Sequence, residues 1–213
     1  MKRKPHLNAR SILYIGLLWL LVTLSCGGSV TGPRLKTAQD LVPLQKGNYW
    51  TYDYVLRIGN EIGPTNSTSI VVDTTLIWEG EEWFGYHISD SVYYHCDSLG
   101  WWELRFNNGF DGFKQLRLKY PVEKGDFWYY HHSPTDSTKM EVFSTSTSTD
   151  TPLGTIDDCI QFGELRLDRL DNVYTHYEWF KPGLGIVKIF SQTALFNGYY
   201  RVYLQQLKDF EIQ

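Results

Sequence analysis

Polar and apolar positions alternate along most of this chain, and that pattern is typical of β-strands. From residue 50 onward, short runs rich in aromatic and β-branched residues are separated by turns of Gly, Asn, Asp and Pro. No segment keeps a helical period over ten or more residues. We expect strands at 50–56, 69–78, 83–88, 92–96, 101–106, 115–120, 127–132, 140–149, 159–167, 173–180, 186–192 and 199–207.

Short strands at regular spacing predict an all-β fold. The short connections favour an antiparallel meander that forms a curved open sheet, a sandwich or a barrel. Residues 41–213 are long enough for one β domain and offer enough aromatic residues for a sizeable core.

One short phrase occurs twice in the chain. Residues 43–54 read PLQKGNYWTYDY and residues 121–132 read PVEKGDFWYYHH, with Pro, Lys, Gly, Trp and Tyr at the same spacing. The Pro fixes the entry, and the Gly supplies backbone freedom for a turn, so each copy predicts the start of a strand. The repetition indicates two similar halves of one sheet.

Each copy also places two large aromatic side chains on one face of its strand, because residues two apart point the same way. Such rings either pack in the core, which we favour, or form a platform for a ligand. The adjacent Trp101 and Trp102 point to opposite faces. The candidate aromatic binding surface consists of Trp50, Tyr52, Trp128, Tyr130, Trp101 and Trp102.

Residues 1–25 have the pattern of an export signal. Four basic residues and no acid precede an uncharged, mostly apolar run at 11–25, which is shorter than the roughly 20 residues of a spanning helix. An uncleaved N-terminal anchor is the alternative. The sequence Thr-Leu-Ser-Cys at 23–26 resembles a bacterial lipobox, which implies that Cys26 becomes the lipidated first residue. Thr23 departs from the usual Leu, so ordinary secretion stays open.

Lipidation of Cys26 would make the membrane a partner through acyl chains that anchor the protein durably. Gly27 does not look like an inner-membrane retention signal, so we favour the outer membrane. Residues 26–40 contain few large apolar side chains and are expected to form a flexible tether.

The charge of the exported part argues against two classes of partner. The whole chain has 20 basic and 24 acidic residues, a formal charge of −4. Without the four basic residues of the signal, 16 basic and 24 acidic residues remain, a charge of −8. An acidic chain is unsuited to nucleic acid and to electrostatic binding of anionic lipid.

Three motifs in order resemble a family of uncharacterised exported bacterial proteins, often lipoproteins. They are the Pro-Leu-x-x-Gly-x-x-Trp-x-Tyr opening at 43–52, Pro-x-Gly-Thr-x-x-x-Cys at 152–159 and Pro-Gly-x-Gly-x-Val-Lys at 182–188. The resemblance implies a mainly β fold, similar to the open, curved sheets of periplasmic lipoprotein carriers, and implies no activity.

The two remaining cysteines, Cys96 and Cys159, either form a disulfide, as exported proteins often do, or are two buried thiols. The family resemblance favours thiols slightly, because its motif contains Cys159 and not Cys96.

No pattern in the sequence indicates a metal or another cofactor. The runs His95-Cys96-Asp97 and His131-His132 put neighbouring side chains on opposite faces of a strand, so they do not converge on an ion. Nucleophile motifs and phosphate-binding glycine loops are absent from the sequence. Paired acids such as Glu164 and Glu178 leave a glycoside hydrolase open, since such enzymes use two carboxyl groups.

These observations favour a non-enzymatic envelope lipoprotein that binds an apolar or amphipathic ligand, or that scaffolds other envelope proteins. The alternatives are an exported carbohydrate-active enzyme and a carbohydrate-binding module. A carrier requires an apolar cavity or groove, whereas an enzyme requires two carboxyl groups facing each other across a cleft.

Overall fold

The computed structural model describes residues 41–106, 111–167, 173–194 and 199–213, which all belong to one compact unit, Leu35–Gln213. The expected signal peptide, the lipidation site at Cys26 and the tether lie outside the described residues. Within the described ranges there is no helix long and apolar enough to cross a membrane.

The described residues form thirteen strands and no helix, which confirms the all-β prediction. The first part of the chain contains β1 (Tyr49–Ile58), β2 (Glu61–Ile62), β3 (Asn66–Trp78), β4 (Glu81–Tyr86), β5 (Val92–Asp97), β6 (Gly100–Arg105) and β7 (Phe113–Lys119). The second part contains β8 (Phe127–Ser133), β9 (Asp136–Thr151), β10 (Gly154–Leu167), β11 (Val173–Lys181), β12 (Gly185–Ala194) and β13 (Tyr200–Glu211).

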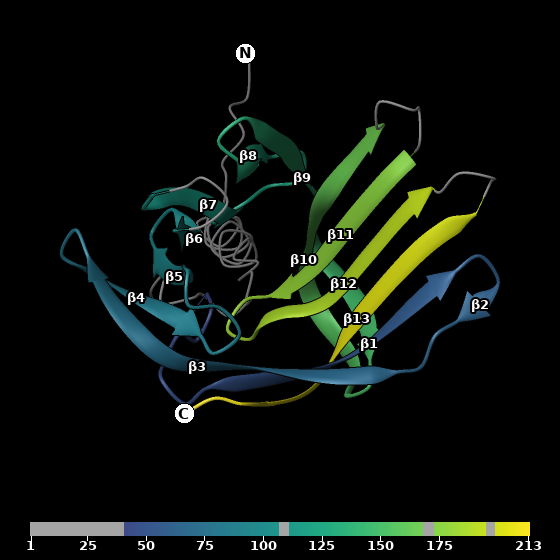
Figure 1. Ribbon diagram of the computed structural model, residues 1–213, viewed down its shortest axis with the longest axis horizontal. Helices are drawn as coiled ribbons and strands as arrows, with labels where there is room; N and C mark the ends of the chain where they lie inside the picture. The colour runs from purple at the N-terminus through teal and green to yellow at the C-terminus, as the bar shows by residue number, and fades with distance from the viewer. Residues whose placement is uncertain (1–40, 107–110, 168–172, 195–198) are drawn as a thin grey trace, which may run out of the picture. The chain divides into compact units, whose positions relative to one another are not determined.

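The strands build one antiparallel sheet in the order β7-β6-β5-β4-β3-β1-β13-β12-β11-β10-β9-β8, with β2 paired to β1 beside this path. Each half of the chain is thus a six-strand meander, and the halves meet where β1 pairs with β13 (Figure 1). The sheet curls until its two edge strands, β7 and β8, come close to each other, so it resembles a nearly closed barrel. The expected antiparallel meander is therefore confirmed, and of the three forms considered the structure has a curved sheet that approaches a barrel, not a sandwich.

Side chains rather than a backbone ladder join β7 to β8, and we call this junction the seam. The Gln115 amide on β7 takes the place of a neighbouring strand: its Oε1 accepts from the backbone N–H of His131 at 2.8 Å, and its Nε2 donates to the His131 carbonyl at 3.2 Å. Lys119 at the end of β7 pairs with Asp126 before β8, at 2.9 Å. Polar and apolar residues alternate in the strand expected at 115–120, and the polar Gln115 of that strand is buried.

The repeated phrase makes the same turn twice. Gly47 and Gly125 have φ angles of +96° and +90°, a backbone region that favours glycine. Gly47 donates to the Val72 carbonyl at 2.8 Å, and the Val72 N–H donates back to the Asn48 carbonyl at 2.9 Å. In the second copy the same two bonds, both 2.9 Å long, join Gly125, Val142 and Asp126. The two halves therefore begin with equivalent turns, as the repetition indicated.

The aromatic side chains of these phrases pack mainly in the core. Trp50 Nε1 donates to the Leu184 carbonyl at 2.7 Å, and the Tyr52 hydroxyl donates to the Ile186 carbonyl at 2.9 Å. Trp101 and Trp128 are also buried in the core, against Phe180 and Phe162 with ring centroids 6.0 and 5.5 Å apart. Trp102 is half-buried, with the ammonium group of Lys114 4.9 Å from its ring centroid. Core packing, not an exposed platform, is the role of the four fully buried rings.

Cys96 on β5 and Cys159 on β10 are both buried free thiols, so the disulfide alternative is not the arrangement in the structure. Burial raises the pKa of the Cys96 thiol to about 12 and that of the Cys159 thiol to about 11. Both thiols therefore remain protonated at neutral pH, so neither is an activated thiolate nucleophile there.

Candidate functional site

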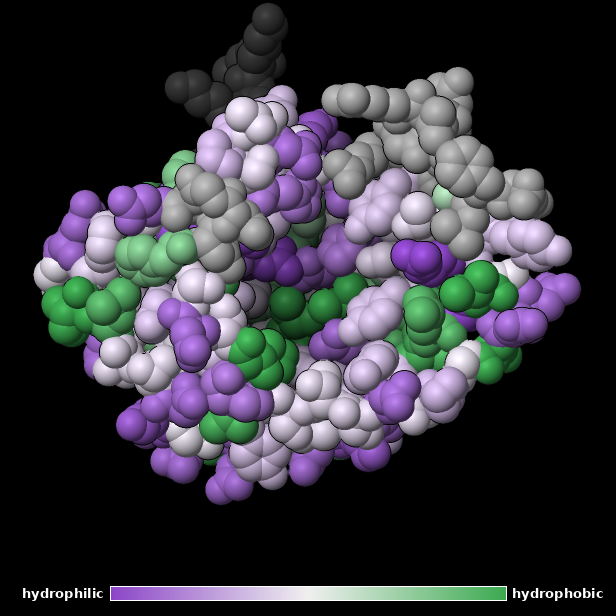
Figure 2. Space-filling view, in the orientation of Figure 1, coloured by the Kyte–Doolittle hydropathy of each residue, from purple (hydrophilic) through white to green (hydrophobic). Residues whose placement is uncertain are grey.

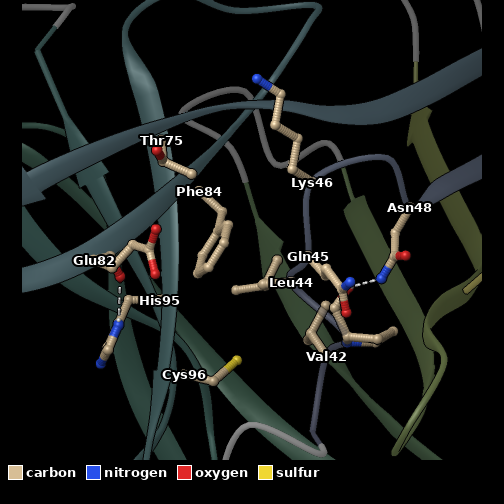
Figure 3. A pocket seen from close by; sticks show the side chains of 11 residues that line it. Val42, Leu44, Gln45, Lys46, Asn48, Thr75, Glu82, Phe84, His95 and Cys96 are labelled. Carbon is tan, nitrogen blue, oxygen red and sulfur yellow. Dashed lines mark hydrogen bonds between the residues drawn. The ribbon is translucent and has the colours of Figure 1, made fainter. Parts of the chain in front are cut away.

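A pocket of about 760 Å³ lies between the segment that leads into β1 and the wall formed by β3, β4 and β5 (Figure 3). We call it the entry pocket. Val42 to Lys46 and Asn48 line one side, and Thr75, Glu82, Phe84, His95 and Cys96 line the other.

The segment that forms one side of the entry pocket is held firmly at both ends. The Leu41 carbonyl accepts from the N–H of Gly183, in the turn between β11 and β12, at 3.0 Å. The Asn48 side chain is fully buried; its Nδ2 donates to the Pro43 carbonyl at 2.7 Å, and its Oδ1 accepts from the N–H of Gln213 at 2.9 Å. These bonds fix the backbone of the segment, so the pocket is pre-formed rather than assembled by a loose loop.

The centre of the entry pocket is apolar. Figure 3 shows the ring of Phe84 and the side chain of Leu44 pointing toward each other across it, with Cys96 and Val42 beyond them. Because its pKa is raised, the Cys96 thiol is uncharged and adds another small apolar surface. A hydrocarbon chain or ring bound here would lose contact with water and gain contact with apolar side chains on several sides.

The edge of the entry pocket is polar. His95 Nδ1 is 2.9 Å from the Glu82 carbonyl oxygen, and the His95 ring packs against that of Trp83 with centroids 5.3 Å apart. Lys46 extends away from the apolar centre (Figure 3). Glu82 is the one carboxylate among the described lining residues, so the pocket does not hold the pair of acids that glycoside hydrolysis needs.

A second, smaller cavity of about 220 Å³, the inner cavity, lies on the concave face of the sheet. In the view of Figure 2 the molecule is hollowed, with hydrophobic and hydrophilic residues both exposed in the hollow. The inner cavity is lined by Arg117, Tyr130, His132, Met140, Glu164, Tyr174, His176, Glu178 and Ile189.

An irregularity in β7 brings Arg117 to this cavity. Leu116 pairs with Trp102 and Leu118 with Trp101, so Arg117 is the extra residue of a β-bulge. Bulges re-aim side chains and often occur beside functional sites. The Arg117 guanidinium lies over the Trp101 and Tyr130 rings, 5.6 and 5.3 Å from their centroids, and its Nη2 donates to Oε1 of Glu178.

Glu178 on β11 is the centre of the polar cluster. Its Oε1 also accepts from His176 Nε2 at 2.9 Å, and His176 Nδ1 is 2.7 Å from Ser191 Oγ on β12. Burial by itself would raise the pKa of the Glu178 carboxyl, but the Arg117 charge and the His176 hydrogen bond outweigh burial and lower it to about 2. Glu178 is therefore a carboxylate at any physiological pH.

A second polar network borders the same cavity at the seam. The Tyr130 hydroxyl donates to the Glu103 carboxylate, with 3.1 and 3.2 Å to its two oxygens, and Gln115 Nε2 donates to Glu103 Oε1 at 3.0 Å. Arg105 pairs with Glu103 and contacts the Tyr130 hydroxyl. Burial raises the pKa of Tyr130 to about 12, so this hydroxyl stays protonated.

Glu164 and Glu178, the acids considered for hydrolysis, do line one cavity, and both are buried. Glu178 does not suit the part of general acid, because its pKa of about 2 leaves it without a proton at neutral pH. Its salt bridge to Arg117 also makes it a structural anion.

Sequence reasoning missed Leu44, Phe84, Arg117 and His176. His176 stands two positions before Glu178, a spacing that puts both on one face of a strand. That spacing was the one signal that could have indicated a polar cluster. Among the described residues, no three His, Cys, Asp or Glu side chains are placed to hold a metal ion.

Comparison with known proteins finds no matching family model and no matching curated protein. A putative exported protein with YmcC-like fold from Bacteroides fragilis NCTC 9343 is similar in structure, with a TM-score of 0.42 and 14% identity over 80% of this chain and 98% of that chain. A putative lipoprotein from Parabacteroides distasonis ATCC 8503 has a TM-score of 0.38 and 13% identity over the same shares. At these values the chain is similar to both proteins only in the course of the backbone.

Proposed function

We propose that this chain is a non-enzymatic lipoprotein of the bacterial envelope whose β domain binds an amphipathic ligand in the entry pocket. The observation that carries the proposal is the pairing of an apolar centre, Leu44 against Phe84, with a charged edge at Lys46 and Glu82. A volume of about 760 Å³ is within the range of pockets that bury small molecules, roughly 300–1,000 Å³.

The chemistry of the pocket suits a ligand with an apolar part and a polar head. Its apolar part would lie between Leu44 and Phe84, where each buried methylene contributes about 0.8 kcal/mol to binding. Its polar head would stay at the edge of the pocket, near Lys46 and Glu82, where water remains accessible. A single-chain lipid or another amphiphile with one head group has this form.

The expected lipid anchor would keep the domain close to the membrane, which is a source of such ligands. Residues 26–40 are a tether of 15 residues, which reaches about 50 Å when extended. A domain attached to Cys26 in this way would stay within reach of the membrane surface, for which we favour the outer membrane. The motif resemblance to exported lipoproteins supports the same location.

Ligand binding is tested with a fluorescent fatty acid titrated into the purified mature chain, followed by displacement with unlabelled palmitate. Leu44→Gln should weaken binding about tenfold, since it places an amide in the apolar centre. The matched control is Leu153→Gln in the exposed turn between β9 and β10, which should leave binding unchanged.

Equal affinity of the two variants would refute the entry pocket as the site. A folded wild-type chain that binds no amphiphile would refute the carrier role and favour scaffolding. The anchor is tested separately by the intact mass of the protein from its native host, where added acyl mass on a chain beginning at Cys26 is expected. An unmodified chain with another N-terminus would exclude lipidation.

A further inference from the structure

A further cavity, of about 380 Å³, lies where the turn after β1 meets the start of β13, on the right of Figure 1. We call it the rim cleft. It is lined by Arg57, Gly59, Asn60, Gln192, Tyr199, Tyr200 and Val202. None of these residues lines the entry pocket or the inner cavity.

Three neighbouring strands form the floor of the rim cleft. Val202 on β13 pairs with Gln192 on β12 and with Arg57 on β1. Adjacent strands are about 4.8 Å apart, so Gln192 and Arg57 stand about 10 Å apart with the small apolar Val202 between them. Ser191 faces the concave side, where it contacts His176, so its neighbour Gln192 faces the convex side. The rim cleft therefore opens on the convex face of the sheet.

Two tyrosine rings form one end of the rim cleft. Tyr200 precedes Val202 by two positions and shares its face, and Tyr199 and Tyr200 are 56% and 48% exposed. The Tyr199 ring packs directly on Gly59, where a methyl group would come within 2.6 Å of the ring. The Gly59 N–H donates to the Tyr200 carbonyl at 2.8 Å. These contacts fix the position of both residues while about half of each side chain stays accessible to a ligand.

The polar groups of the rim cleft are available for binding. Arg57 Nε donates to the Gly59 carbonyl at 2.9 Å, which orients the guanidinium, whereas its Nη1 and Nη2 bond to none of the residues that the structure describes. The amides of Asn60 and Gln192 likewise have no hydrogen-bond partner among the described residues. Each amide offers both donors and an acceptor.

The charge of the rim cleft favours an anionic group. Arg57 is the one charged residue among the described lining residues. Glu61 and Arg201, the cross-strand partners of the next residue, Ile58, have opposite charges that offset each other. A guanidinium with two free terminal nitrogens binds a carboxylate through two parallel hydrogen bonds. Because the exported chain is acidic overall, a ligand with one carboxylate suits this surface better than a densely charged polymer.

We propose that the rim cleft binds an acidic sugar, a single uronate residue of a glycan. Its carboxylate would accept from Arg57, and its hydroxyls would exchange hydrogen bonds with Asn60 and Gln192. The C–H face of its ring would stack on Tyr200. A volume of about 380 Å³ is the share of about thirteen water molecules, which admits one or two sugar rings. The ten residues of β1 separate this cleft from the entry pocket by roughly 30 Å, so the site adds to the proposed function and can be tested independently of it.

The test is an NMR titration of the ¹⁵N-labelled mature chain with methyl β-glucuronide, methyl β-glucoside and acetate. The two glycosides differ only in the carboxylate, and acetate supplies a carboxylate without a sugar ring. The glucuronide should bind at least about tenfold more tightly than the glucoside and should shift the amide signals of Gly59 and Val202. Acetate should not bind.

Two variants separate the contributions of charge and stacking. Arg57→Gln should weaken the glucuronide about tenfold and leave the glucoside unchanged. The matched control is Arg201→Gln, which removes the same charge from an exposed position outside the lining and should bind both glycosides like the wild type. Tyr200→Ala should weaken both glycosides, because both would stack on its ring.

Several results would overturn the proposal. They are absence of glucuronide binding by the folded chain, signal shifts confined to residues outside the rim cleft, and equal affinity for the glucuronide and the glucoside. Acetate that binds as tightly as the glucuronide would show a site for anions alone. Equal effects of Arg57→Gln and Arg201→Gln would show that the preference arises from general charge and not from this cleft.

Discussion

Replacing Glu178 by Gln should destabilise the domain strongly at neutral pH and much less in acid. The variant removes the carboxylate to which Arg117 donates and leaves that guanidinium buried without its partner. Loss of one member of a buried ion pair costs about 3–5 kcal/mol. The pH dependence of that loss is the more specific part of the prediction, because it follows from the titration of the Glu178 carboxyl.

The magnitude comes from the pKa of Glu178, which is about 2 in the folded domain against an ordinary value of 4.5. Since the folded value is the lower one, the carboxylate stabilises the fold above pH 4.5, and this contribution is lost as the pH falls toward 2. A difference of about 2.5 pH units corresponds to about 3 kcal/mol at neutral pH. About 2 kcal/mol of that is lost by pH 3.

Urea unfolding followed by tryptophan fluorescence, at pH 7 and pH 3, measures the free energy of unfolding of wild type and Glu178→Gln. The gap between them should shrink by about 2 kcal/mol in acid. Other carboxyl groups with lowered pKa, such as Asp53 and Asp126, are present in both proteins and cancel. The control Glu141→Gln breaks an exposed pair with Lys139 and should cost less than about 1 kcal/mol at pH 7. A gap that is the same at both pH values would refute the reasoning.

Three further changes test other parts of the structure. Gln115→Leu should lower the free energy of unfolding by about 1–3 kcal/mol in urea. It removes both Gln115 bonds to the His131 backbone and leaves the His131 N–H without its seam partner, while Arg105 still donates to the His131 carbonyl. A loss below about 0.5 kcal/mol would contradict that role. Gly125→Ala should lower the free energy of unfolding by roughly 1–2 kcal/mol through backbone strain at its φ of +90° alone, since nothing lies within 4 Å of the added methyl group. Gly125→Asn should lower it less, because Asn tolerates this backbone region better. A melting temperature raised by alanine would be inconsistent with the strain. Native Cys96 and Cys159 should resist iodoacetamide at pH 8 and react fully once unfolded, as mass spectrometry would show; equal labelling of the native chain would disprove their burial.

The strands and their pairing into a meander were predictable from alternation and turn residues. The expected strand at 127–132 corresponds closely to β8, Phe127–Ser133. The Ser- and Thr-rich run at 140–149 belongs to β9, which extends over Asp136–Thr151. The repeated phrase indicated two similar halves because a Lys-Gly turn and an aromatic pair are local signals, readable without knowledge of the rest of the fold.

The candidate sites were less predictable, for two physical reasons. Alternation in 115–120 separates two faces of β7, but it does not tell which face is interior when the interior itself is polar, and a bulge then turns Arg117 inward. The entry pocket joins Leu44 to Phe84, which are far apart in sequence and meet only when the sheet curls. Leu44 belongs to the motif at 43–52 and Phe84 to no motif, so nothing in the sequence connects the two residues.

The two junctions between the halves differ in what it takes to open them. Separating β1 from β13 breaks a ladder of ten paired positions, whereas separating β7 from β8 breaks side-chain bonds alone. The domain therefore has a strong junction along β1 and β13 and a weak junction at Gln115. The local opening that costs the least free energy should separate β7 from β8 and leave every strand pairing intact. Hydrogen exchange of the His131 amide should therefore be faster than exchange of the amides that pair β1 with β13.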